Sequence, residues 1–237
     1  MKTTYYPSDS RGKADHGWLS ARHSFSFASY YNPERMHFGS LRVLNDDTIA
    51  PGKGFGMHPH DNMEIITIPL EGALAHEDSM GNGSTIQSGD VQVMSAGSGI
   101  WHSEFNASKE EVCKILQIWV FPNQRQVEPR YDQLTIPLGK MENQLFQVVS
   151  PNQDDSGLWI HQRAWFYLGK FNRGKQISYS GKHPENGQYL FLLHGKAMIG
   201  DQELNERDAL SIEDTTQFDL RFSEDTYILI MDIPMHI

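Results

Sequence analysis

Two short stretches place histidine and glutamate side chains two residues apart. His58 and His60 lie in GMHPHDNME, and His102 and Glu104 lie in SGIWHSEFN. Side chains two apart along a β-strand point to the same face, so each pair would be aimed at one point if both stretches are strands. Two such strands side by side offer three imidazole nitrogens and one carboxylate. This set suits iron, copper, nickel, manganese or zinc, whereas magnesium and calcium prefer oxygen ligands.

A single His-x-His pair also has a simpler explanation, because histidines are common on protein surfaces and in hydrogen-bonded cores. The second pair favours the metal site, and so do the glycines around both pairs. Gly52 precedes the first pair by six residues, and Gly97 and Gly99 precede the second.

The elements that must position these residues are short strands. Alternating or apolar runs are separated by turns from Leu41 onward: LRVLN, MEIITIPL, GALAHED, DVQVM and ILQIWVF. Strands at this spacing indicate an all-β sandwich or barrel rather than βαβ units. The segment 121–137 contains three prolines, and we interpret it as the connection between two domains.

The second half of the chain repeats the pattern of the first. LLHGKAMIG parallels the earlier PLEGALAHE, and YILIMDIP parallels KILQIWVFP. A repeat of this length indicates duplicated barrels rather than a solenoid. Aligning 173–186 with 51–64 places Ser180 and Lys182 at the positions of the first histidine pair. Neither replaces an imidazole ligand, so we expect a metal-bearing first domain and a metal-free second one.

These features resemble the two cupin motifs. The first is a glycine, five residues, His-x-His, a glutamate and a later glycine, and 52–72 is similar to it. The second is similar to 89–106, with Ser95 where proline is usual and two extra residues before the histidine. More specifically, the chain resembles pirins over residues 15 to about 131, in the segments DHGWL, SFSF, FGMHPHDNMEI, HEDSMGN, SAGSGIWHSEFN and LQIWV.

The resemblance implies an all-β fold of two tandem cupin barrels, also called double-stranded β-helix or jelly-roll barrels. It implies a metal-binding N-terminal cupin domain over residues 1–131 and a C-terminal cupin domain without metal ligands over residues 132–237.

The resemblance also implies a ligand set. Pirins use the glutamate of the second motif, so the expected ligands are His58, His60, His102 and Glu104. Glu64, the glutamate of the first motif, is then expected to orient an imidazole.

Pirins are associated with quercetin 2,3-dioxygenase activity. The resemblance therefore implies a metal-dependent dioxygenase that opens a flavonol or related aromatic ring with O₂. The expected cofactor is one divalent transition metal, with Fe(II) as first choice and copper, nickel, manganese, cobalt or zinc as alternatives. Glu104 would be the general base that takes the proton of the substrate hydroxyl. The alternative is a regulator with little or no enzymatic activity that senses metal or redox state and binds a protein partner.

Composition narrows the partners. The net charge of −10 over 237 residues argues against direct binding to nucleic-acid phosphates. The single cysteine, Cys113, excludes a disulfide within the chain and fits a reducing compartment; its apolar setting predicts a buried, unreactive thiol. The sequence shows no apolar signal-peptide core and no run of membrane-spanning length. We expect a cytoplasmic protein without membrane contact, and a monomer by resemblance to the family.

Several other side chains have ordinary interpretations. His76 lies in the hairpin-like AHEDSMGNG and is expected on the surface, and His23 is isolated. Asp46 and Asp47 are expected to be a solvated pair in a turn. Four apolar residues alternate with the predicted ligands and are expected in the barrel core or, alternatively, in a wall around an aromatic substrate: Phe55, Met57, Trp101 and Phe105.

Overall fold

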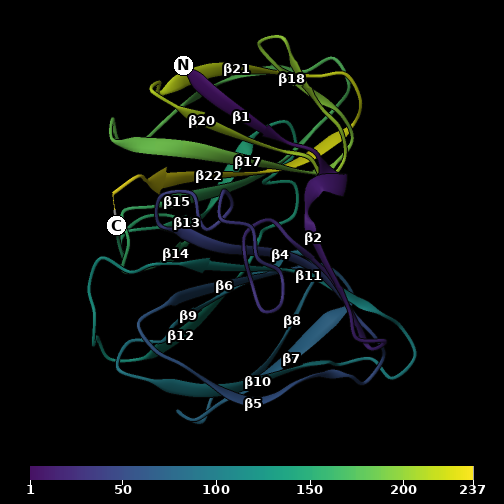
Figure 1. Ribbon diagram of the computed structural model, residues 1–237, viewed down its shortest axis with the longest axis vertical. Coiled ribbons are helices and arrows are strands. Elements are labelled where there is room, and N and C mark those ends of the chain that lie inside the picture. The colour runs from purple at the N-terminus through teal and green to yellow at the C-terminus, as the bar shows by residue number, and fades with distance from the viewer. Residues whose placement is uncertain (237) are drawn as a thin grey trace.

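The computed structural model describes residues 1–236, which form 22 β-strands and one short 3-10 turn, η1 (Ser8–Ser10). Figure 1 shows two barrels stacked one above the other, with the N-terminal half of the chain in the lower barrel. Each barrel combines a seven-stranded sheet with a four-stranded sheet. The prediction of an all-β fold of two tandem cupin barrels is confirmed. No helix among the described residues is long and apolar enough to cross a membrane.

The first barrel contains the predicted metal ligands. Its seven-stranded sheet has the order β12 (Arg130–Thr135), β9 (Asp90–Ser95), β6 (Glu64–Glu71), β11 (Cys113–Val120), β4 (Leu41–Ile49), β3 (Leu19–His23) and β2 (Gly12–Asp15). Its four-stranded sheet has the order β5 (Gly54–His60), β10 (Ile100–Asn106), β7 (Ala73–Asp78) and β8 (Gly83–Gln87).

The second barrel repeats this plan. Its large sheet has the order β1 (Lys2–Tyr6), β20 (Ala209–Glu213), β17 (Asn186–His194), β22 (Thr226–Pro234), β15 (Trp165–Phe171), β13 (Leu145–Ser150) and β14 (Leu158–Trp159). Its small sheet has the order β16 (Gln176–Ser180), β21 (Gln217–Phe222), β18 (Ala197–Ile199) and β19 (Gln202–Leu204). In β16, Ser180 faces Gln217 across the sheet, as His58 faces His102 in the first barrel.

The first strand of the chain belongs to the second barrel. β1 pairs with β20 along its whole length, and in Figure 1 it lies in the upper barrel among the yellow C-terminal strands. β12 takes the corresponding edge in the first barrel, where it pairs with β9. The predicted connection 121–137 therefore contains a strand of the first sheet. The predicted boundary between residues 131 and 132 falls inside β12.

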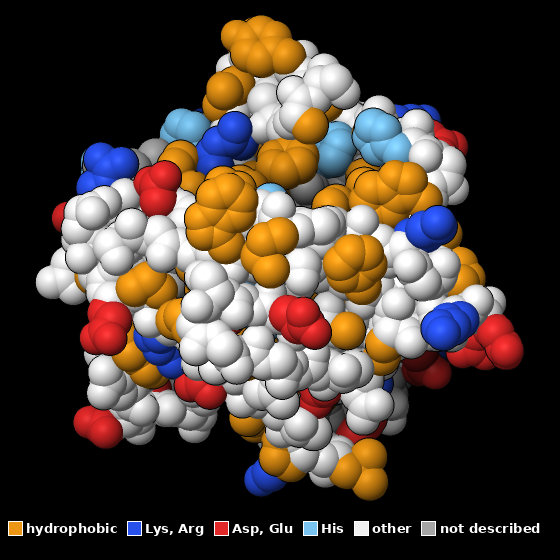
Figure 2. All heavy atoms as spheres, turned by 90° about the horizontal axis from the view of Figure 1, so that it is seen from below, with side chains coloured by type: hydrophobic (Ala, Val, Ile, Leu, Met, Phe, Trp, Pro, Cys, Tyr) orange, Lys and Arg blue, Asp and Glu red, His pale blue; other side chains and the backbone are white. Residues whose placement is uncertain are grey.

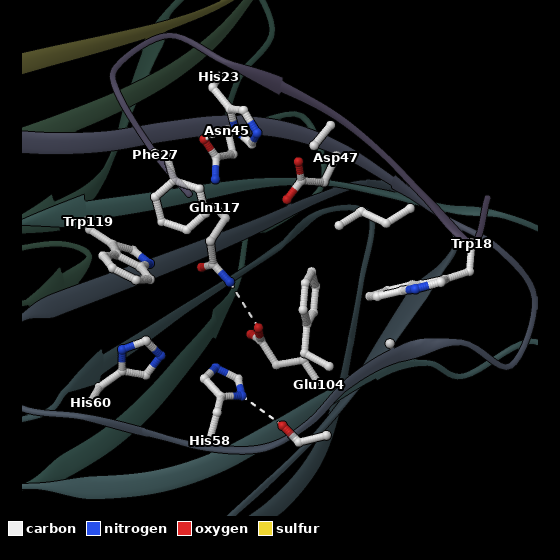
Figure 3. A pocket seen from close by; sticks show the side chains of 15 residues that line it. Trp18, His23, Phe27, Asn45, Asp47, His58, His60, Glu104, Gln117 and Trp119 are labelled. Atoms are coloured by element: carbon white, nitrogen blue, oxygen red, sulfur yellow. Dashed lines mark hydrogen bonds between the residues drawn. The ribbon is translucent and has the colours of Figure 1, made fainter. Parts of the chain in front are cut away.

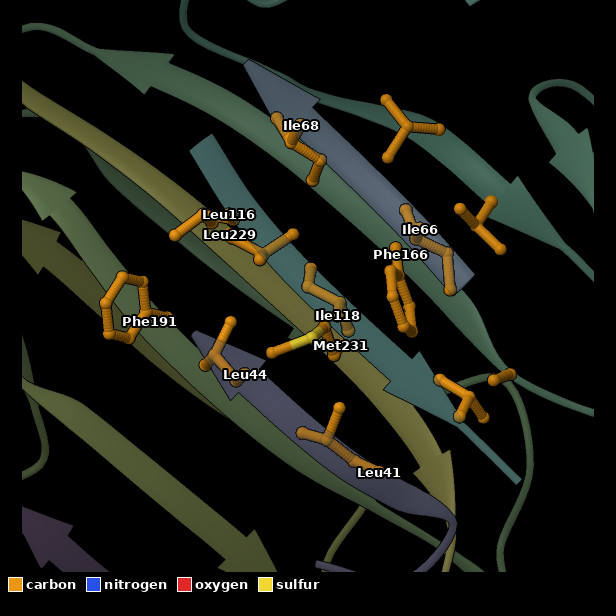
Figure 4. Packing of buried hydrophobic residues seen from close by; sticks show 14 of the residues in the cluster. Leu41, Leu44, Ile66, Ile68, Leu116, Ile118, Phe166, Phe191, Leu229 and Met231 are labelled. Carbon is orange, nitrogen blue, oxygen red and sulfur yellow. The ribbon is translucent and has the colours of Figure 1, made fainter. Parts of the chain in front are cut away.

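The largest hydrophobic core lies between the two seven-stranded sheets. Figure 4 shows side chains of β4, β6 and β11 packed against side chains of β15, β17 and β22, including Ile66, Ile118, Phe166 and Met231, all of them buried. The opposite faces of β6 and β11 are buried too, because they line the first barrel. Burial on both faces explains why these strands are apolar almost throughout.

Candidate metal centre

β5 and β10 bring the two ligand pairs together. They are antiparallel neighbours in which His58 lies directly opposite His102, and His60 lies opposite Ile100. Gly54 permits this approach, because a Cβ atom at that position would collide with the backbone carbonyl of Glu104. The register shifts between His102 and Glu104, yet both side chains are buried on the inner face.

Three imidazoles converge at one point inside the first barrel. The ring centroids lie 4.4 Å apart for His58 and His102, and 4.9 Å apart for His60 and each of the other two rings. One ring nitrogen from each lies within 4.8 Å of the others. Nδ1 of His58 lies 2.8 Å from the Gly56 carbonyl oxygen, so Nδ1–H donates there and Nε2 is free to bind a metal.

The protonation of these rings favours metal binding. Burial, reinforced by the neighbouring imidazoles, lowers the pKa of His60 to about 4 and that of His102 to about 2. Both rings are therefore neutral at pH 7, as a ligand must be. Nε2 of His102 is buried without a hydrogen-bond partner among residues 1–236. A buried acceptor without a partner destabilises the fold unless something binds it. The ring nitrogens of the three histidines therefore fit a divalent transition metal as ligands.

Glu104 lies beside this cluster and is held by other polar groups. One of its oxygens accepts a hydrogen bond from Nε2 of Gln117 at 2.9 Å. The Thr67 hydroxyl lies 3.0 Å from Oε1 of Gln117 and 3.4 Å from the other Glu104 oxygen. Since this hydroxyl has one proton and lies nearer to Gln117, the second Glu104 oxygen keeps its lone pairs. Burial raises the pKa of Glu104 to about 7.

The structure groups a Glu104 oxygen with nitrogens of His76 and His102, all within 4.8 Å of one another, rather than with His58 and His60. It therefore brings the three predicted histidine ligands together and places the predicted glutamate at their side. The four-ligand set remains a prediction.

His76 is not a surface residue, contrary to the sequence-based expectation. It is fully buried in β7, which pairs with β10 so that His76 lies opposite Glu104. Its Nδ1 lies 3.5 Å from Nδ1 of His102, and its Nε2 lies 3.4 Å from the Asp78 carboxylate. If Nε2–H of His76 donates to Asp78, its Nδ1 accepts the His102 Nδ1–H, which leaves Nε2 of His102 as the metal ligand. His76 also stacks on Tyr131.

Two further expectations have opposite outcomes. The prediction that Glu64 orients an imidazole is wrong for the described contacts, because its carboxylate accepts a hydrogen bond from the Ser95 hydroxyl at 2.7 Å. The prediction of a buried Cys113 thiol is confirmed, and burial raises its pKa to about 11.

A cavity of about 470 Å³ opens beside the histidines, and Figure 3 shows its lining. Aromatic side chains form much of the wall. Trp119 meets His60 edge to face with ring centroids 4.9 Å apart, and Phe55 meets Trp18 in the same way at 5.3 Å. The volume lies in the range of small-molecule sites. The alternative interpretation of Phe55, as part of a wall beside the ligands, is thus the one that the structure supports.

The other three apolar residues that alternate with the ligands do not lie in the core. Met57 is 54% exposed, Trp101 52% and Phe105 41%. They project from the outer face of β5 and β10, which no other sheet covers in the described part of the chain.

Asp47 also differs from its expected place in a solvated turn. Asp47 lies on β4 in the lining of the cavity, and its side chain is 4% exposed. The neighbouring lining residue Asn45 has its Oδ1 at 2.9 Å from Nδ1 of His23. Its neighbour Asp46 faces the other way and pairs with Arg11 at 3.3 Å. The alternation of LRVLNDDTI contains this signal, because Asp47 shares strand parity with the buried Val43 and Ile49.

Known proteins resemble this chain along nearly its whole length. It matches the Pirin family over residues 6–120 and the quercetinase C-terminal cupin domain over residues 147–233. A protein of Escherichia coli K12 named quercetin 2,3-dioxygenase is 40% identical over 224 residues, which are 94% of this chain and 95% of that one. A pirin-like protein of Caulobacter vibrioides is 40% identical over 227 residues, 95% and 97% of the two chains.

A solved structure resembles this chain in fold along nearly its whole length. The bacterial pirin YhhW of Escherichia coli, in complex with nickel(II), superposes with a TM-score of 0.93 at 36% identity, covering 98% of this chain and 99% of that one. Family match, sequence identity and fold agree with one another and with the histidine cluster: the chain belongs to the pirin family.

Proposed function

We propose that the protein is a metal-dependent dioxygenase that opens the ring of a flavonol or a related hydroxylated aromatic compound with O₂. The observation that carries this proposal is the convergence of His58, His60 and His102, because the first two of these residues line an aromatic cavity. The name of the Escherichia coli relative, quercetin 2,3-dioxygenase, supports the choice of reaction.

The three histidines, with Glu104 as fourth ligand, would hold the ion. Fe(II) is our first choice, because its chemistry includes O₂ activation at histidine and carboxylate sites; nickel is the ion in the solved relative. When bound, the metal supplies a Lewis acid for the substrate oxygen and a centre at which O₂ reacts.

The side chains around the ion have separate tasks. Trp18, Phe55 and Trp119 offer flat apolar surfaces to an aromatic ring and exclude water from it. Glu104 would release the ion to accept the proton of the substrate hydroxyl, on the oxygen that Gln117 does not occupy. In the metal-free protein burial raises its pKa to about 7, and Gln117 fixes the direction of its carboxylate.

The test is oxygen uptake by iron-loaded protein with quercetin, alongside nickel-loaded protein and a His58→Ala, His60→Ala double variant. The proposal expects loss of flavonol absorbance in step with oxygen consumption, and neither in the double variant. Protein shown to contain iron or nickel that consumes no oxygen with quercetin would contradict it.

One observation favours a second candidate, a metal-sensing regulator that binds a protein partner. Met57, Trp101 and Phe105 are exposed on the strands that carry the histidines. Figure 2, which views the molecule from the side of β5 and β10, shows hydrophobic side chains gathered on this face next to histidines. A change of the metal or its oxidation state would act on these strands directly.

The two candidates differ in turnover. An enzyme should reach turnover rates on the order of 1 per second or more. The substitution Trp101→Ser should leave that activity unchanged. A regulator should turn over quercetin only trivially.

A further inference from the structure

The cavity contains a second carboxyl group besides Glu104, and the proposed reaction does not use it. Asp47 is 4% exposed and contributes to the lining. In Figure 3 it lies with Asn45 on the far side of the cavity from His58 and His60, and its carboxyl group points inward.

Asp47 has no hydrogen-bond partner for Oδ1 in the described part of the chain, and that atom is enclosed. Its pairing neighbours cannot supply one, because the side chains across from it on β3 and β11 are those of Ala21 and Ile115. The neighbouring Asn45 directs its Oδ1 to His23. Burying a carboxyl group without a hydrogen-bond partner destabilises the fold, so a position of this kind calls for a ligand group.

The chemistry of the position selects the ligand group. Burial raises the pKa of Asp47 to about 8, so near neutral pH the group is mostly a neutral carboxylic acid. Such a group both donates and accepts a hydrogen bond, which suits a phenolic hydroxyl and gives a cation no advantage. The distance from the histidines means that this hydroxyl must belong to a different part of the ligand from the one at the metal.

We propose that Asp47 is the distal anchor of the cavity, where it hydrogen bonds a hydroxyl group on the part of an aromatic substrate farthest from His58 and His60. The proposal rests on the proposed function for the class of substrate. It makes Asp47 a specificity-determining residue that distinguishes polyhydroxylated flavonols from those without remote hydroxyls.

The test uses binding rather than turnover. Zinc-loaded protein, which cannot exchange electrons through its metal, is titrated with quercetin and with 3-hydroxyflavone, and quenching of tryptophan fluorescence reports occupancy beside Trp18 and Trp119. The two ligands share the hydroxyl expected at the metal, and only quercetin has hydroxyls elsewhere. We expect the wild type to prefer quercetin by about tenfold or more, the size of one good hydrogen bond.

Two variants assign the preference. Asp47→Leu should abolish it while keeping the affinity for 3-hydroxyflavone, whereas Asp47→Asn, which still donates and accepts, should retain it within about threefold. Asp46→Asn is the matched control, because that neighbour faces Arg11 and should change nothing.

The outcomes separate the inference from the proposed function. Three results would overturn the inference. Asp47→Leu could keep the preference for quercetin, Asp47→Leu could lose affinity for both ligands equally, or the wild type could bind both ligands with equal affinity. If Asp47→Leu does not fold, equal affinities of the wild type for the two ligands would still overturn the inference. Binding with an Asp47-dependent preference, but no oxygen uptake by iron- or nickel-loaded protein, would sustain the inference and refute the dioxygenase. Turnover of quercetin without that preference would support the dioxygenase and overturn the inference.

Discussion

Replacing Asp47 by Asn should stabilise the metal-free protein, and by more as the pH rises. The ordinary pKa of an aspartate is 3.8, and burial raises that of Asp47 to about 8 in the folded protein. Below pH 3.8 both the folded and the unfolded states carry the proton. Between these two values only the folded state keeps it, so the stability contributed by this group falls as pH rises, by roughly 1.4 kcal/mol per pH unit. Above pH 8 the loss levels off.

Asp47→Asn has no proton to lose. From pH 5 to pH 7 the difference in unfolding free energy between variant and wild type should therefore grow by about 3 kcal/mol in favour of the variant. Urea unfolding of both proteins with a chelator present, followed by tryptophan fluorescence at pH 5, 6 and 7, measures this difference. Asp46→Asn serves as the control for removal of a charge from β4. A difference that stays constant across this pH range would refute the claim that Asp47 is held neutral.

Three further predictions concern the metal centre. Glu104→Gln should leave ion binding by the histidines measurable but lower turnover by about 100-fold or more; full turnover with metal bound would exclude the base role. His76→Phe keeps the stacking on Tyr131 but removes the hydrogen-bond acceptor for Nδ1–H of His102. Competition with a chelating dye should therefore show metal affinity lower by about 10- to 100-fold. Equal affinity would refute the role of His76 in orienting His102. Gly54→Ala should lower the free energy of unfolding in urea by about 1–3 kcal/mol, because its Cβ collides with the backbone of β10. Gly56→Ala should lower it little, because Gly56 has open space around it. Equal effects of the two substitutions would contradict this account of the β5–β10 contact.

The sequence predicted what depends on strand parity alone. His58 and His60 share a face because β5 is extended. His102 lies beside them because its strand, β10, is the neighbour of β5. His76 was missed because its burial depends on the pairing of β7 with β10, between residues nearly 30 apart in sequence. The His-x-Asp spacing of His76 and Asp78 was the signal available, since it repeats the pattern of the ligand pairs.

The remaining errors come from layers that parity cannot reveal. Alternation shows that Trp101 points away from the histidines, but only the structure shows that this side chain stays 52% exposed among residues 1–236. Conversely, two adjacent aspartates are typical of a turn, and Asp47 was assigned to one, although β4 continues through it with the cavity on one side.

The pairing of β1 with β20 sets the order in which the molecule can be completed during synthesis. Lys2 pairs with Glu213, 211 residues later, so at 5–20 residues per second the first strand waits roughly 10–40 s on the ribosome for its partner. The first barrel has all its strands once Thr135 has emerged. β1 is short, with three lysine or threonine residues before its two tyrosines, a composition that lets an unpaired edge wait without recruiting other chains. The histidines of the first barrel can thus come together while β1 is still unpaired.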